Sequence, residues 1–195
     1  MKSASSEVWA HFDAFMSGFT AARELHARAA TAGAFLECVC LGASILDAML
    51  RVGIVLQHQL DKKTREIPVE LILQSKGDKA IPEREIFRRA HAASVIDDTF
   101  LELLQSLYDQ RNRVIHRYII SRITTLEVLS IARTYEEAIE RLTVRVREIE
   151  KQQIELGVGI TVSGPPLEGE EGRSFEEEIA DEKHTPALAR VLRRR

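Results

Sequence analysis

The stretch AGAFLECVCLGASILDAML, residues 32–50, decides the fold because it is the most apolar run in the 195-residue chain. Its length alone would allow a membrane span. Glu37 and Asp47 interrupt it, however, and acidic side chains are costly near the middle of a bilayer. A helix that is apolar on most of its sides is typical of the centre of a protein. We therefore expect residues 34–60 to form a buried central helix, and we expect no contact with a membrane.

Composition and charge are those of one globular domain. A chain of this length can bury a proper core, and 45% of its residues are hydrophobic. The formal net charge is -3, so any site for nucleic acid must be local. The two cysteines, Cys38 and Cys40, would point to different faces of a helix, which argues against a disulfide framework or a zinc site. With no signal peptide in the N-terminal sequence, these features favour the reducing cytoplasm.

Helical periodicity recurs along most of the chain, without internal repeats and without the alternation of strands. The connector at residues 61–82 contains VELIL, which is either a helical turn or a short strand. The pattern predicts an all-α bundle of about five helices within a domain of residues 1–156. Besides the central helix, the expected helices are residues 6–30, 82–96, 97–120 and 124–156.

Residues 157–195 have a different composition, with five of the ten glycines and three of the five prolines of the chain. Within them, residues 168–182 carry eight acidic residues and one basic residue, and four arginines lie in the last six residues. Such a segment cannot bury enough apolar surface to order itself. We expect a flexible C-terminal tail, acidic and then basic. The alternative is a docking segment for a partner.

The stretch RNRVIHRY, residues 111–118, places much polar chemistry near the end of the helix expected at 97–120. Arg111 falls inside the apolar stripe of that helix, where an unpaired charge is costly, so it needs a partner or a purpose. Arg111 and His116 are about 140° apart on an ideal helix. They would meet on one ligand only through the long arginine side chain, a distorted turn or a second subunit. The residues of the expected stripe are Leu104, Leu107, Tyr108, Ile115, Tyr118 and Ile119.

The residue types of this stretch suit a phosphodiester. The guanidinium of Arg111 matches phosphate oxygens, and the imidazole of His116 can move a proton near neutral pH. The amide of Asn112 can hold an oxygen or orient the imidazole. RNA supplies its own nucleophile, the 2′-hydroxyl, so its cleavage needs no metal. The structural alternative is that Arg111 pairs with a buried acid and that His116 is an ordinary core histidine.

Arg111-x4-His116, with Asn112 directly after the arginine, closely resembles the R-x4-6-H motif of HEPN domains, which are all-α bundles. With Tyr118 the stretch reads R-x4-H-x-Y, which resembles the HEPN toxins encoded beside a small nucleotidyltransferase (MNT) antitoxin. The resemblance covers about residues 5–155.

The resemblance implies a metal-independent endoribonuclease that leaves a 2′,3′-cyclic phosphate and a 5′-hydroxyl. It also implies a homodimer in which two copies of the motif face each other across a cleft. Arg111 would then stabilise the scissile phosphate, His116 would act as acid or base, and Asn112 would orient the substrate or the histidine. Tyr118 would be the residue that the nucleotidyltransferase antitoxin modifies with AMP, which silences the toxin.

Two acids of the central helix are candidates to support this site. Asp47 or Glu37 would face Arg111 and position it, or else Asp47 would simply pair with Arg51 one turn later. The remaining histidines have no ligand spacing and no glycine-rich phosphate loop is present, so we expect no metal and no cofactor. Two function classes remain: a toxin-like endoribonuclease, and a non-catalytic HEPN module that binds nucleotide or RNA or dimerises within a larger complex.

Overall fold

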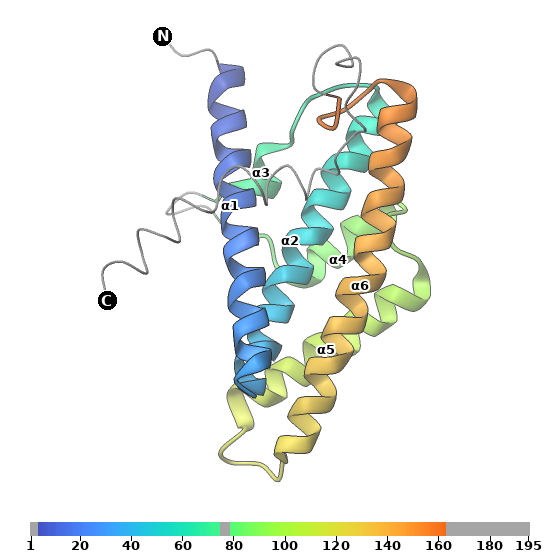
Figure 1. The fold of residues 1–195 in the computed structure, drawn as a ribbon. Coiled ribbons are helices and arrows are strands. Elements are labelled where there is room, and N and C mark those ends of the chain that lie inside the picture. Colours follow the sequence, from blue (N-terminus) through green and yellow to red (C-terminus); the bar gives the residue numbers. More distant parts are fainter. Residues whose placement is uncertain (1–3, 75–78, 163–195) are drawn as a thin grey trace, which may run out of the picture.

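The computed structural model describes residues 4–74 and 79–162 (Figure 1). Over these residues the chain has six helices and no strand, which confirms the all-α class. The additional helix is the short α3, so the VELIL segment forms a helical turn. The helices are α1 (Ala4–Thr31), α2 (Phe35–Lys62), α3 (Val69–Ile72), α4 (Glu83–Ala92), α5 (Asp98–Arg117) and α6 (Thr125–Leu156).

Helix α2 forms the centre of the bundle and packs against α1 on one side and α6 on the other (Figure 1). Gly42 allows the close approach of α6, because a Cβ atom there would lie 3.0 Å from the Cβ atom of Tyr135. Within the described residues, α2 alone has the length and composition of a membrane span. Of its most apolar window, 67% is buried inside the protein, as in the core helix of a bundle.

Local capping fixes where α5, which carries the motif, and α6, which follows it, begin. Helix α5 begins after Asp97, whose side chain accepts a hydrogen bond from the backbone N–H of Phe100 at 2.7 Å. Helix α6 begins with a capping box between Thr124 and Glu127. Helix α5 ends at Arg117, three residues earlier than the sequence predicts, so a turn separates the motif from α6.

The buried face of α5 differs from the expected stripe. Leu104 and Leu107 are buried as expected, and Tyr108 and Tyr118 pack against the core. Ile115 is 45% exposed and Ile119 is 94% exposed, so both are corrections to the predicted stripe. Ile119 is exposed because the helix has already ended. Phe100 and Val114 complete the buried face in their place.

The helical domain continues past the predicted boundary at residue 156. Gly157 ends α6 in the left-handed conformation, with φ 65°, and the chain folds back onto α2. The side chain of Gln59 accepts a hydrogen bond from the backbone N–H of Ile160 at 3.1 Å, and Ile160 is buried. Residues 163–195, which hold most of the predicted tail, lie outside the described residues.

Candidate functional site

Arg111 has the partner that its position requires. It forms an ion pair with Glu83, the first residue of α4, and both side chains are only 18% exposed. The Nε and Nη2 groups of Arg111 donate to the Asn112 side-chain oxygen at 3.4 and 3.0 Å. The guanidinium carbon lies 4.9 Å from the centroid of the Tyr108 ring. Arg111 is therefore held by three side chains from α4 and α5.

The charge of Arg111 acts on titratable groups of α2, α4 and α6. Burial raises the pKa of the Glu83 carboxyl, and the charge of Arg111 opposes that rise. Burial likewise raises the pKa of the Cys40 thiol on α2 and of the Tyr135 hydroxyl on α6, again against the charge of Arg111. The Tyr135 hydroxyl donates to the Leu107 carbonyl at 3.1 Å, which ties α6 to the turn of α5 that leads into the motif.

The acid that holds Arg111 is neither of the two that we singled out on α2. Asp47 pairs with Arg51 at 2.6 Å, and Glu37 is exposed in the first turn of α2. The charge of Asp47 still raises the pKa of Glu83, so Asp47 lies near the Arg111 pair without joining it. The intrahelical interpretation of Asp47 is therefore the one that the structure favours.

Glu83 was missed in the sequence because its partner is on another helix. The sequence does contain one indication of this contact, because α4 and α5 carry opposite charges at positions that meet when the two helices pack antiparallel. Besides the Glu83–Arg111 pair, Arg84 meets Asp109 at 2.6 Å and His91 meets Asp98 at 2.9 Å between α4 and α5. The position also suits an acid, because a carboxylate in the first turn of a helix interacts favourably with the helix dipole.

His116 lies apart from this cluster. It is exposed near the end of α5, and among the described residues it has no hydrogen-bond or ion-pair partner. On an ideal helix it stands about 7.5 Å further along the axis than Arg111. The structure thus brings Arg111 and Asn112 together and leaves His116 facing solvent. Tyr118 is half-buried at the C-cap of α5.

The surface around His116, which we call the motif end, is both cationic and apolar. Arg117 and Arg122 are exposed, and Arg113 lies 3.8 Å from Glu127 with about half of each side chain exposed. Exposed apolar side chains that gather in one stretch of the chain are typical of an interaction site. The exposed apolar residues of the motif end are Ile115 (45%), Ile119 (94%), Ile120 (82%) and Leu126 (76%).

Two further arginines of α4 are exposed. Arg88 and Arg89 both pair with Glu85, as expected of a solvated helix face. Across residues 4–74 and 79–162, no group of three His, Cys, Asp or Glu side chains is arranged to hold a metal ion.

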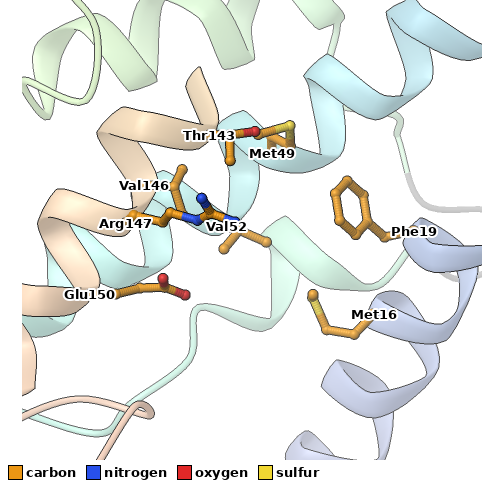
Figure 2. A pocket seen from close by; sticks show the side chains of 8 residues that line it. All are labelled: Met16, Phe19, Met49, Val52, Thr143, Val146, Arg147 and Glu150. Carbon is orange, nitrogen blue, oxygen red and sulfur yellow. The ribbon is translucent and has the colours of Figure 1, made fainter. Parts of the chain in front are cut away.

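A separate pocket lies between α1, α2 and α6 (Figure 2). Its walls are mostly apolar, with Met16 and Phe19 from α1 and Met49 from α2. The α6 residues that line it begin at Thr143, eight residues after Tyr135, or about 12 Å further along the helix. None of the motif residues lines it, so it is separate from the site around Arg111.

No protein-family model, no curated protein and no solved structure matches this chain. The resemblance to HEPN domains therefore depends on two features: the residues of the 111–118 stretch and their place near the end of the fifth of six helices in an all-α bundle.

Proposed function

We propose that this chain is a metal-independent, toxin-like endoribonuclease of the HEPN type that acts as a homodimer. The observation that carries the proposal is the pairing of two features at one end of α5. Arg111 and Asn112 form a preassembled, half-buried group. His116 is exposed on the motif end, which carries exposed cationic and apolar side chains. A phosphate-binding group and a proton-transfer group in a cationic setting are what cleavage of RNA requires.

In the proposed reaction, the 2′-oxygen of the RNA attacks the adjacent phosphorus and the bond to the 5′-oxygen breaks. The products are a 2′,3′-cyclic phosphate and a 5′-hydroxyl. Arg111 donates hydrogen bonds to the phosphate oxygens, where negative charge increases in the transition state. One proton leaves the 2′-hydroxyl and another reaches the 5′-oxygen, so an acid and a base are both needed. Two copies of His116 in a dimer supply both, and Asn112 orients the guanidinium.

The dimer in this proposal joins two motif ends. Ile119 and Ile120 stand almost fully exposed in the turn that directly follows the motif. Burial of these side chains against a second copy would remove apolar surface from water. It would also bring His116 of one chain toward Arg111 of the other. On a single helix these two side chains point in different directions, so a site that uses both needs the second chain.

Regulation of this activity is proposed to act through Tyr118 and a nucleotidyltransferase antitoxin. Tyr118 lies seven residues after Arg111, which is about 20° from it around an ideal helix. An AMP group on the Tyr118 hydroxyl would bring its phosphate toward Arg111 and add bulk where RNA is to bind.

A second candidate is a non-catalytic HEPN module that binds nucleotide or RNA, or that dimerises within a larger complex. The observation that favours it is the Glu83–Arg111 pair itself, because a half-buried pair joining α4 to α5 can serve stability alone. The exposed isoleucines of the motif end suit a dimerisation module equally well.

Incubation of the purified protein with RNA in the presence of EDTA separates the two candidates. The endoribonuclease cleaves under these conditions, and His116→Ala loses cleavage while it keeps its helical circular dichroism. The matched control is His91→Ala, because His91 lies at the other end of the α4–α5 pair, beside Asp98. Wild-type protein that binds RNA without cleaving it would favour the binding module.

A further inference from the structure

We propose that Glu83 is a positioning residue that orients the guanidinium of Arg111 so that its two free N–H groups meet a phosphate. This inference rests on the proposed function and adds to it a residue from a second helix. It starts from a count of hydrogen-bond donors. Arginine has five N–H donors, and three of those of Arg111 point to Glu83 and Asn112. The other two have no acceptor among the described residues.

The arrangement fixes the plane of the guanidinium as well as its place. Glu83 binds one Nη group, Asn112 binds the opposite edge, and the Tyr108 ring lies 4.9 Å from the guanidinium carbon. Because both charged side chains are 18% exposed, water competes weakly for these contacts. A phosphate can therefore bind the remaining N–H groups without displacement of Glu83 or Asn112, and Arg111 needs no reorganisation when it binds.

Neither acid of α2 takes part in holding Arg111, whose side-chain partners are Glu83 and Asn112. Asp47 is engaged by Arg51, whose Nη1 group also donates to the Leu71 carbonyl at 3.0 Å. Glu37 stands exposed on the first turn of α2. Loss of Glu83 thus leaves Arg111 with Asn112 and the Tyr108 ring alone, and the guanidinium is free to swing toward solvent.

A purely structural ion pair makes a different prediction. If Glu83 served only to join α4 to α5, its loss would lower the stability of the protein and leave the activity of each folded molecule unchanged. If Glu83 positions Arg111, the turnover number itself falls. The two roles are therefore separated by kcat measured well below the melting temperature of each variant.

The kinetic experiment compares Glu83→Gln, Glu83→Asp and wild-type protein on one RNA. We expect kcat of Glu83→Gln to fall by about 100-fold, because misplacement of a reacting group by about 1 Å has that effect. Glu83→Asp keeps the charge and should recover part of the loss. The control is Glu85→Gln, which removes a half-buried carboxylate of the same helix from Arg88 and Arg89 and should leave kcat unchanged. A Glu83→Gln variant with wild-type kcat overturns the inference.

The double variant Glu83→Gln with Arg111→Ala tests whether Glu83 acts through Arg111. A positioning residue has nothing left to position once the arginine is gone. The double variant should therefore be as active as Arg111→Ala alone. A further loss in the double variant would mean that Glu83 acts on something else and would contradict the inference.

A measurement without RNA distinguishes failure of this inference from failure of the proposed function. Nitrogen-15 NMR of the arginine Nε–H groups should give a slowly exchanging signal for Arg111 that disappears in Arg111→Ala. We expect inorganic phosphate to shift this signal, and Glu83→Gln to weaken the phosphate affinity at least about tenfold, since a charge-assisted contact orients the fork. Equal phosphate affinity in both proteins overturns the inference, whether or not the wild type cleaves RNA.

Discussion

Gly53 of α2 lies so close to Val95 that a Cβ atom on the glycine would stand 2.7 Å from the Val95 Cγ1 atom. The contact lies between the central helix and the segment that joins α4 to α5. It therefore fixes how deeply that segment sits against α2, and with it the helix pair that carries Glu83 and Arg111.

Gly53→Ala is expected to destabilise the protein by about 1–3 kcal/mol, because the added methyl group forces a shift in a packed core. Gly18→Ala is the matched control. A Cβ atom on Gly18 would meet nothing within 4 Å, and alanine in a helix interior should add about 0.5–1 kcal/mol of stability over glycine. Urea denaturation of both variants measures whether each substitution lowers or raises the free energy of unfolding. Destabilisation of equal size in both would contradict the packing described for α2.

The pH dependence of stability should reveal Glu83. Because burial raises its pKa above the ordinary value of 4.5, folded protein binds more protons than unfolded protein between that value and the raised pKa. In that window the free energy of unfolding falls as the pH rises. In Glu83→Gln this contribution is absent. The free energy of unfolding of the wild type, minus that of Glu83→Gln, should therefore decrease as the pH rises from 4 toward neutrality. Denaturant titrations at several pH values measure this difference. An increase over the same range would mean that the attraction of Arg111 outweighs burial.

The exposed isoleucines of the motif end should control the oligomeric state. Ile119→Asp combined with Ile120→Asp is expected to convert a dimer into a monomer, because carboxylates would have to be buried without partners. Sedimentation at micromolar concentration measures this change, and the monomer should lose RNA cleavage. Ile154→Asp is the control, since Ile154 is 57% exposed on the last turns of α6. A wild-type protein that sediments as a monomer would rule out this interface.

Tyr118→Phe is expected to keep cleavage and to escape silencing when the chain is co-expressed with a nucleotidyltransferase of the proposed antitoxin type. Intact mass should increase by one or more AMP units in the wild type and remain unchanged in Tyr118→Phe. Tyr108→Phe serves as the control, because the Tyr108 ring lies under Arg84 and Arg111 and should not be modified. Neutralisation of an unmodified wild-type protein would mean that the partner acts by binding alone.

The sequence was sufficient to predict the helices, but it was not sufficient to predict the contacts between them. Helical periodicity located α2 and α6 to within two residues. Periodicity also placed Ile115 on the buried stripe, yet it is half exposed. A period gives the angle of a side chain around its helix, whereas burial depends on which part of that helix its neighbours cover.

The candidate site shows the same limit more sharply. The position of Arg111 within an apolar stripe correctly implied that it needs a partner. The partner, Glu83, lies 28 residues away on a helix whose packing against α5 cannot be read from a single sequence. Asp47 was a reasonable candidate because it is an acid on the central helix. It forms an ion pair with Arg51, which lies one turn away on the same helix.

The most direct measurement of the central claim uses an RNA oligonucleotide with a single mapped cleavage site, with EDTA present. In a matched oligonucleotide, only the 2′-hydroxyl next to the scissile phosphate is replaced by hydrogen. If that hydroxyl is the nucleophile, the wild-type protein cleaves the first oligonucleotide to a 2′,3′-cyclic phosphate and a 5′-hydroxyl, and it leaves the second intact at that position. Cleavage of the 2′-deoxy position at the same rate, or products that carry a 5′-phosphate, would contradict the mechanism assigned to Arg111 and His116.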